Sequence, residues 1–323
     1  MRVSKKSSTF ASFMNTFGDK WTFTSFGESH GAAIGGVLDG VPSGLHIDPA
    51  MIRTELERRS GRGVAGVSAR AKNEPDEVEW LSGVMGDGVQ VTGGELITLG
   101  TPIAFIIRNK DARPEDYEWL KNTYRVGHAD KVYEQKYGIR DWRGGGRASA
   151  RETAARVVAG CIAKQELAQQ GIRIHANLVQ VGAETDPTKF ADVIAAYQKE
   201  GDSIGGIVEC RITGLPVGIG EPIFDKLQAH LAYAVMSINA CKGFEYGTGF
   251  GGVSQPGSAI NAISGGISGG ISDGTEVVFR CVFKPTPSTP KAGVKGRHDA
   301  CVAVRAVPVV EAMAAMAVRD LMN

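Results

Sequence analysis

The sequence has 323 residues, of which 42% are hydrophobic and 22% are charged, and its formal net charge at pH 7 is +1. A chain of this length and composition can bury a substantial core and forms one large domain or two smaller ones. The nearly balanced charge excludes a general attraction to nucleic acid or to a membrane surface, so any binding of anions must depend on local clusters of cations.

The N-terminal residues carry no recognisable targeting signal. The first thirteen contain two lysines and several serines but no hydrophobic run of signal-peptide length, and no stretch of about 18 apolar residues predicts a membrane span. We interpret residues 1–13 as a mobile extension and expect residues 14–323 to form one continuous unit. The five cysteines form an odd set without a CxxC pair, which argues against a disulfide framework or a zinc site and favours the cytoplasm.

The first distinctive motif is GESHG, residues 27–31, which satisfies the GxSxG pattern of a serine nucleophile elbow. Such an elbow has a strand before the serine and a helix after it. KWTFTSF could be the strand, but AAIGGVLDGV after the motif is rich in glycine and β-branched residues and makes a poor helix. The hydrolase interpretation is therefore weak, and the presence of His30 between glycines needs another explanation.

Helical and extended patterns alternate through the rest of the chain. A helix is predicted from Asp48 and Pro49, a cap followed by a proline in the first turn, to Gly61. Further helices are predicted at 114–124, 149–171, 187–201, 225–238 and 308–322. Alternating or β-branched runs predict strands at 77–84, 100–109, 172–182, 205–215 and 275–283. The mixture predicts a single α+β or α/β unit.

The most informative segment spans residues 125–164. Ser149 and Glu152 have the spacing of a capping box, which predicts a helix start directly after a run of glycines. Exposed backbone N–H groups at such a start, together with Arg147 and Arg151, favour an anionic ligand. A plain capped helix with solvated arginines explains the same residues, and the capping box alone favours that plainer interpretation.

Two further groups of cations accompany this segment. The first lies on or just past the helix predicted at 48–61: Arg53, Arg58, Arg59 and Arg62. The second lies in a loop rich in proline and glycine: Lys284, Lys291, Lys295 and Arg297. His30 and His128 both sit beside glycines and acidic or hydroxyl neighbours, so an imidazolium acting as general acid near a bound phosphate is a reasonable hypothesis. The residues by themselves thus indicate an enzyme that acts on a small polyanion.

Three long stretches, in this order, resemble the signature stretches of the chorismate synthase family: GESHGAAIGGVLDGVP (27–42), GGRASARETAARVVAGCI (145–162) and GRHDACVAVRAVPVVEAM (296–313). The resemblance extends between them and covers nearly the whole chain after Met14. It implies the family's β-α-β sandwich, an α+β fold with helices packed between antiparallel sheets. It also implies a homotetramer with one FMN per subunit.

The resemblance implies a lyase of the shikimate pathway, which supplies aromatic amino acid biosynthesis. In the family's reaction, 5-enolpyruvylshikimate 3-phosphate loses phosphate and a ring proton by anti-1,4-elimination to give chorismate. Reduced FMN is required although no net oxidation or reduction takes place. NADPH is a possible source of reducing equivalents, used either by the enzyme itself or by an external flavin reductase.

The resemblance also assigns roles by position. His30 resembles the histidine that keeps the reduced flavin in its correct protonation state, and His128 the acid toward the departing phosphate. Asp299 resembles the aspartate near flavin N5 that assists removal of the proton that N5 takes from the substrate. Substrate-binding arginines are matched by Arg59, Arg62, Arg125, Arg151 and Arg297. FMN contacts are matched by Ala148, Ser149, Ala150, Asn239, Ala240, Gly269, Lys284, Pro285, Thr286, Pro287, Ser288 and Arg297. Ser29 is then a turn residue, and the capped helix start is a ligand site.

The sequence departs from the family pattern near residues 61–66, 257–262 and 290–296, where the arginine spacing is unusual or the loops are short. Arg62 lies in the first of these places. Short loops predict a less complete cover over the flavin and poorer exclusion of water. Two other functions stay open: a serine esterase acting through Ser29, and a phosphate-sensing or nucleic-acid-binding module, although a net charge of +1 predicts little salt-dependent affinity for nucleic acid.

Overall fold

The computed structural model describes residues 14–61, 75–86, 95–294 and 298–322. The predicted extension of residues 1–13 lies outside this range and stays a prediction, as does the expectation of one unit from 14 to 323. Among the predicted site residues, Arg62 and Arg297 also lie outside it.

The first of two large sheets has five antiparallel strands. In spatial order they are β1 (Thr16–Phe17), β2 (Thr22–Phe26), β3 (Ala33–Asp39), β8 (Ile103–Arg108) and β5 (Val78–Ser82). The residues after the GESHG motif therefore form a strand and not a helix. Gly36 of β3 is required because the ring of Phe23 on β2 lies 2.2 Å from where its Cβ would be. A smaller sheet orders β4 (His46–Ile47), β7 (Leu96–Thr98) and β6 (Val84–Met85).

The second large sheet has four antiparallel strands. Their spatial order is β11 (Cys241–Tyr246), β14 (Val277–Phe283), β10 (Gly206–Thr213) and β9 (Arg173–Val181). Every second residue of β14 is buried, which is the alternation that its sequence predicts. A separate hairpin pairs β12 (Ile267–Ser268) with β13 (Ile271–Ser272).

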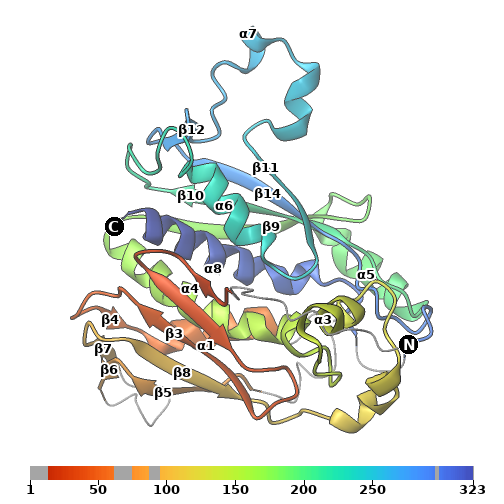
Figure 1. Cartoon of the computed structure of the whole chain (residues 1–323). Helices are drawn as coiled ribbons and strands as arrows, with labels where there is room; N and C mark the ends of the chain where they lie inside the picture. Colours follow the sequence, from red (N-terminus) through yellow and green to blue (C-terminus); the bar gives the residue numbers. More distant parts are fainter. Residues whose placement is uncertain (1–13, 62–74, 87–94, 295–297, 323) are drawn as a thin grey trace, which may run out of the picture.

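A layer of helices separates the two sheets (Figure 1). It contains α1 (Pro49–Ser60), α4 (Thr153–Gln169), α6 (Leu227–Met236) and α8 (Ala303–Leu321), with α4 against β2 and β3 and α8 against β9 and β10. The helices α4 and α8 approach closely at Gly160, where a Cβ would lie 2.3 Å from the Cα of Ala312. This arrangement confirms the predicted α+β sandwich of helices between antiparallel sheets.

The remaining helical segments lie around this frame. The α-helices are α3 (Asp130–Tyr137), α5 (Phe190–Lys199) and α7 (Gly257–Ile260). The 3₁₀ segments are η2 (Pro114–Asn122), η3 (Gly146–Ala148), η4 (Ala150–Glu152), η5 (Pro187–Lys189) and η6 (Gly249–Ser254).

Several predicted helix boundaries differ from the observed ones. The helix α1 follows the prediction, with Asp48 accepting from the N–H of Ala50 and Gly61 in the left-handed conformation. The helix predicted at 149–171 begins as the separate turn η4 before α4. The helix predicted at 308–322 begins five residues earlier, at Ala303, because burial on nearly all sides of α8 holds the chain helical through Pro308.

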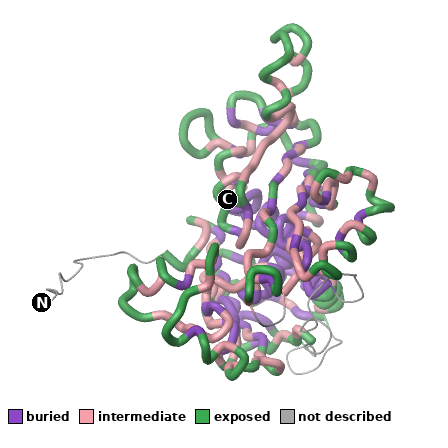
Figure 2. The backbone as a smooth tube through the Cα atoms, turned by 90° about the vertical axis from the view of Figure 1, so that its right-hand side faces the viewer, coloured by how far each residue is buried: buried purple, intermediate pink, exposed green. Residues whose placement is uncertain are grey.

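Buried residues gather in the helical layer and on the inner faces of the sheets, whereas the segment with η6 and α7 projects outward and is mostly exposed (Figure 2). All five cysteines are buried and unpaired. Across the described ranges, no helix combines the length and the apolar character that crossing a membrane requires.

Glu311 of α8 is a fully buried carboxylate that joins two other helices of the helical layer to a strand of the second large sheet. It contacts Nη2 of Arg58 on α1 at 2.9 Å and Nζ of Lys164 on α4 at 2.6 Å, and it accepts from the N–H of Ala176 on β9 at 2.9 Å. Burial acts to raise the pKa of Glu311, but its bonds to Arg58 and Lys164 outweigh burial and hold the pKa below its usual value. The carboxylate therefore stabilises the fold in its ionised form.

Glu311→Gln is expected to lower the free energy of unfolding at pH 7 by about 2 kcal/mol, because it leaves two cations with less compensation. The loss of stability should be smaller than for a buried cation left without any partner, because Glu55 also contacts Arg58 and Lys164. A lowered pKa contributes stability above the unfolded pKa of about 4.3 that disappears as the pH falls, so the variant should also lose less stability than the parent during acidification. Urea unfolding at pH 7 and at acid pH measures both effects. Glu209→Gln, in an exposed ion pair with Arg211, is the control and should change little.

Candidate active site

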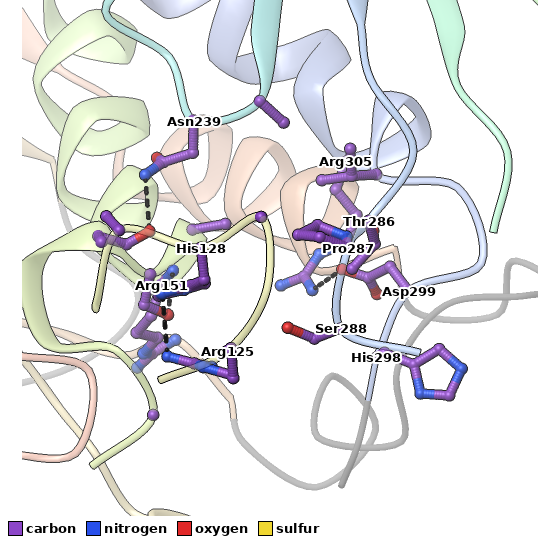
Figure 3. Close-up of a pocket in the computed structure, with 18 of the residues that line it drawn as sticks. Arg125, His128, Arg151, Asn239, Thr286, Pro287, Ser288, His298, Asp299 and Arg305 are labelled. Atoms are coloured by element: carbon purple, nitrogen blue, oxygen red, sulfur yellow. Dashed lines mark hydrogen bonds and ion pairs between the residues drawn. The ribbon is translucent and has the colours of Figure 1, made fainter. Parts of the chain in front are cut away.

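A cavity of about 470 Å³ lies beside the first turn of α4, where segments distant in the sequence meet. Its walls come from the turn after β2, the end of α1, the loop before α3, the turns η3 and η4, the segment after α6, and the chain between β14 and α8 (Figure 3). A cavity of this size suits a ligand as large as a cofactor or a metabolite.

Most of the predicted site residues that the structure describes line this cavity. They are His30, Arg59, Arg125, His128, Ala148, Ser149, Ala150, Arg151, Asn239, Ala240, Lys284, Thr286, Pro287, Ser288 and Asp299. Residues from every predicted group are thus brought together in one place, although their roles stay predictions.

Pro285 and Gly269 do not line the cavity. Pro285 belongs to the stretch 284–288, but its ring packs toward Gly205. A Cβ placed on Gly205 would lie 3.2 Å from Cδ of Pro285. Gly269 lies in the turn between β12 and β13. The N–H of Leu227, the first residue of α6, donates to Gly270 O in this turn at 2.8 Å and so holds the turn against the start of α6. The cavity lies at the other end of α6, about 15 Å along a helix of ten residues. In a single copy of the chain, Gly269 is therefore remote from the other predicted flavin contacts.

The GESHG motif forms a buried turn that presents His30. Asn109 fixes this turn by donating to Glu28 O at 3.0 Å and to Gly31 O at 2.9 Å. Ser29 Oγ lies 3.0 Å from His30 Nδ1, and the edge of the imidazole meets Tyr117 at a centroid distance of 4.8 Å. Ser29 is 1% exposed and no helix follows it, so the elbow interpretation is wrong.

The run of glycines at 144–146 is explained by the histidines that press against it. Gly144 has φ +60°, and a Cβ there would lie 2.0 Å from Nδ1 of His30. Gly145 has φ +88°, and a Cβ there would lie 2.7 Å from Cε1 of His128. Only residues without a side chain let the two imidazoles approach the same backbone segment, and both conformations favour glycine.

Ser149 caps the turn after these glycines, as the sequence predicts, by accepting from the N–H of Arg151. Arg147 does not face the cavity. Its guanidinium donates to Gly27 O and to Ser25 at the end of β2, and so anchors the GESHG turn. The expectation that Arg147 and Arg151 together attract an anion is therefore wrong for Arg147, whose guanidinium binds backbone oxygens of the protein.

Arg59 and Arg151 share one buried carboxylate, that of Asp76. Nη1 of Arg59 lies 3.2 Å from Oδ2 of Asp76, and Nη1 of Arg151 forms an ion pair with Oδ1. Burial, followed by the like charge of Arg305, lowers the pKa of Arg59 below its usual value, although the arginine stays charged at neutral pH. Burial acts to raise the pKa of Asp76, but Arg151 and Arg59 outweigh burial and lower the pKa.

Two more carboxylates, those of Asp130 and Asp299, pair with cations of the walls. Asp130 contacts Arg125 and His128 at 2.8 Å each; burial acts to raise the pKa of Asp130, but hydrogen bonds from these two residues hold it well below its usual range. Asp299 pairs with Arg305 at 2.9 Å, and Nε of Arg305 donates to Arg59 O at 3.1 Å. Figure 3 shows Arg125 and His128 on one wall and Asp299 with Arg305 on another.

Sequence reasoning missed several residues of the site. They are Asp76, Tyr117, Asp130, Tyr133, Lys242, His298 and Arg305. Asp130 had a usable signal, since it follows His128 by two residues in GHAD, and an acid at that spacing can reach back to the imidazole. Asp76 had none, because nothing local connects it to arginines seventeen and seventy-five residues away.

Two buried polar atoms of the cavity walls have no hydrogen-bond partner within the described protein: Oδ1 of Asn239 and Oγ1 of Thr286. Asn239 is oriented by its Nδ2, which donates to Ala148 O at 3.1 Å. Buried polar atoms are normally satisfied, so both atoms indicate a polar ligand in the cavity.

Comparison with known proteins gives a consistent match along the chain. The model of the chorismate synthase family matches residues 21–322. The chorismate synthases of Christiangramia forsetii and Phocaeicola vulgatus are each 45% identical to this chain over 95% of its length, covering 96% and 97% of those proteins. A solved structure described as a crystal structure of chorismate synthase aligns with TM-score 0.73 and 29% identity over 95% of this chain and 92% of that one.

The alignments also bear on the short loops. The alignment with the Christiangramia forsetii protein spans 354 positions, which exceeds the 323 residues of this chain by 31. At least that many aligned positions therefore have no counterpart here. This agrees with the expectation of loops shorter than those of the relatives.

Proposed function

The chain belongs to the chorismate synthase family and is a carbon–oxygen lyase, and on this premise we propose that it catalyses the anti-1,4-elimination of phosphate from 5-enolpyruvylshikimate 3-phosphate with the help of reduced FMN. The observation that carries the proposal is the convergence on one cavity of Asp299, two histidines and three arginines that match the family's site residues. A substrate with one phosphate and two carboxylates needs several guanidinium groups, since arginine binds such anions in a bidentate manner.

The residues around Asn239 and those around Thr286 fit FMN. Their orphaned oxygens supply an acceptor, and in Thr286 also a donor, for the polar atoms of the flavin or its phosphate chain. Lys284 adds a cation, and Ala148 to Ala150 with Ala240 offer small side chains beside which a flat ring can lie. Bound reduced FMN would supply the electron density and the proton acceptor that the elimination needs.

The residues of the chain then have distinct tasks. Arg125, Arg59 and Arg151 bind and orient the anionic substrate, and His128 donates a proton to the departing phosphate. Asp299, held by Arg305, takes up the proton that must finally leave the site, and His30 keeps the flavin side in its working protonation state. The buried carboxylates Asp76 and Asp130 fix the cations without occupying the cavity.

Thr286→Val tests the proposed contact between the Thr286 hydroxyl and FMN, because the variant should lose affinity for FMN without losing stability. The variant should leave the ligand-free protein as stable as the parent or slightly more stable, because it removes a buried hydroxyl without a partner. Its affinity for FMN should fall about five- to tenfold, the usual worth of one hydrogen bond. Thermal unfolding and fluorescence titration with FMN measure the two effects.

Thr98→Val is the matched control. Thr98 is more deeply buried than Thr286, and its hydroxyl donates to Pro42 O at 2.6 Å and accepts from Leu45 N–H at 2.9 Å, outside the cavity. This variant should lose stability and keep its affinity for FMN. An unchanged affinity of Thr286→Val for FMN would contradict the proposed contact between the Thr286 hydroxyl and the flavin.

The reaction itself is tested anaerobically with purified protein, 5-enolpyruvylshikimate 3-phosphate and dithionite-reduced FMN, following chorismate absorbance and phosphate release together. The proposal expects both products in equal amounts and neither with oxidised FMN. Absence of product from a folded protein that binds FMN would contradict it. Turnover in air with FMN and NADPH alone would add an intrinsic flavin reductase activity; its absence would assign the reduction to an external reductase.

We also propose that the protein is a cytoplasmic homotetramer. The five buried free thiols suit a reducing compartment. Several large apolar side chains are strongly exposed on one copy, which favours coverage by others: Val217, Ile223, Phe224, Phe250 and Val253. Analytical ultracentrifugation of the full chain should give four times the subunit mass of 34.2 kDa, and a monomer at micromolar concentration would contradict the assembly.

A further inference from the structure

The carboxylate of Asp130 lies beneath the loop that carries Arg125 and His128. Its side chain is 2% exposed and belongs to the first residue of α3. Oδ2 accepts from the backbone N–H of Arg125 at 3.1 Å and from Nε at 2.9 Å, while Oδ1 accepts from Nη2 at 2.8 Å. Nδ1 of His128 lies 2.8 Å from the same Oδ1. One buried carboxylate thus holds both an arginine and a histidine of the cavity wall.

The contact with Asp130 decides which nitrogen of His128 carries a proton. An ionised carboxylate has no hydrogen to donate, so a lone pair on Nδ1 at this distance would be repelled. Nη2 of Arg125 lies 3.2 Å from Nδ1, but Nδ1 cannot accept from Arg125 and donate to Asp130 at once. The shorter, charged contact assigns the proton to Nδ1. Nε2 is then the nitrogen available to a ligand.

The charges around His128 oppose one another. Arg125 on its own loop disfavours a second positive charge on the imidazole, and so does Lys284, which reaches over from the segment after β14 to donate to Gly127 O at 3.1 Å. Asp130 is the carboxylate that contacts the ring. His30, Tyr133 and Arg151 line the same walls. The protonated form of His128 therefore depends on Asp130 cancelling the charge of Arg125.

We propose that Asp130 is the positioning residue of His128, fixing one proton on Nδ1 and holding the ring as an imidazolium beside Arg125, so that Nε2–H can be given to the departing phosphate. The inference rests on the acid role proposed for His128 and deepens it. Asp130 acts through the histidine rather than on the substrate. A carboxylate that served only to order the loop would leave the titration of the ring unchanged.

The test is the titration of His128 itself, followed by NMR in full-length protein labelled with ¹³C at histidine Cε1. In Asp130→Asn an amide of the same shape replaces the carboxylate while Arg125 stays, so the titration midpoint should fall by about one pH unit or more. In Arg125→Gln the carboxylate stays and the cation is lost, so the midpoint should rise. The opposite directions separate charge coupling from a general loss of structure.

The pH profile of single-turnover phosphate release is measured on the same proteins. In Asp130→Asn the loss of rate at high pH should begin at lower pH by the same interval, which makes the rate about tenfold lower per unit within that range. Asp320→Asn is the matched control. Asp320 is a buried carboxylate that accepts from the N–H groups of residues 19–21 at the far end of α8. This control should lose stability and leave the midpoint and the profile in place.

A midpoint that stays in place in both variants overturns the inference. If Asp130→Asn fails to fold, the test rests on Arg125→Gln alone. A titration midpoint of His128 that does not rise in Arg125→Gln would then overturn the proposed balance of charges. A midpoint that moves as expected while the pH profile stays unchanged upholds the coupling and overturns the acid role of His128. The failure of the inference and the failure of the proposed function are thereby told apart.

Discussion

His128→Ala is expected to slow phosphate release in a single turnover about 10²–10⁴-fold, the usual contribution of a general acid. The side chain of His128 is 15% exposed at the cavity, with Nδ1 on Asp130 and Nε2 available to a ligand. Alanine removes the proton donor and leaves the neighbouring Arg125 in contact with Asp130. The loss should therefore fall on the chemical step more than on substrate binding.

The affinity for FMN should be retained in this variant, within about twofold, because no hydrogen bond to the flavin is removed. The residues proposed to hold FMN, Asn239 and the segment 284–288, belong to segments of the chain other than the loop that carries His128 (Figure 3). Rapid-quench measurement of phosphate with reduced FMN, together with FMN titration, separates the two effects.

His230→Ala is the matched control for this experiment. His230 also pairs with an aspartate, Asp225, at 3.0 Å, but it lies on α6 outside the lining residues of the cavity. Its single-turnover rate should equal that of the parent. An unchanged rate in His128→Ala would remove the acid role, whereas a parallel loss in both variants would indicate a general effect of losing a histidine–aspartate pair.

The parts of the fold that follow from local physics could be predicted from the sequence. The helix α1 lies where its cap Asp48, its first-turn proline and Gly61 indicate, and the alternation of β14 places its buried face correctly. The helix α3 was not predicted, because Asp130 is its only buried residue and no apolar stripe marks it. The strand β3 was excluded as a helix but not predicted as a strand, since Gly35 and Gly36 weaken the extended pattern.

The residues of the site likewise divide into those that could be predicted from the sequence and those that could not. The presence at the cavity of Arg59, Arg125, Arg151 and the two matched histidines could be predicted because motifs name their positions. The partners that fix their charge and orientation could not be predicted, because the pairing depends on tertiary proximity. Asp76 meets Arg151 across seventy-five residues, and the glycines 144 and 145 are explained only once His30 and His128 are seen to press against them. Sequence therefore predicted the matched groups at the cavity better than the groups that hold them in place.

Asp76→Ala is expected to lower the free energy of unfolding by about 3–5 kcal/mol, the cost of removing one partner from a buried ion pair. The side chains of Arg59, Arg151 and Asp76 are 2%, 6% and 3% exposed, so bulk water compensates the charges of the arginines poorly once the carboxylate is lost. Two guanidinium groups would then lose the carboxylate that they share. Urea unfolding at neutral pH measures the loss, and Asp141→Ala, which breaks a more exposed pair with Arg143, should cost far less.

Sulfate provides the sharper test of the same prediction. An anion that enters the cavity can take the place of the missing carboxylate between Arg59 and Arg151, so added sulfate should stabilise Asp76→Ala more than it stabilises the parent or Asp141→Ala. General salting-out strengthens all three proteins alike and cancels in the comparison. A loss below about 1 kcal/mol, or an equal response to sulfate in all three, would contradict the claim that Asp76 holds the two arginines against their mutual repulsion. Because those arginines face the cavity, the same anion response reports how ready the site is to receive a phosphate or a carboxylate.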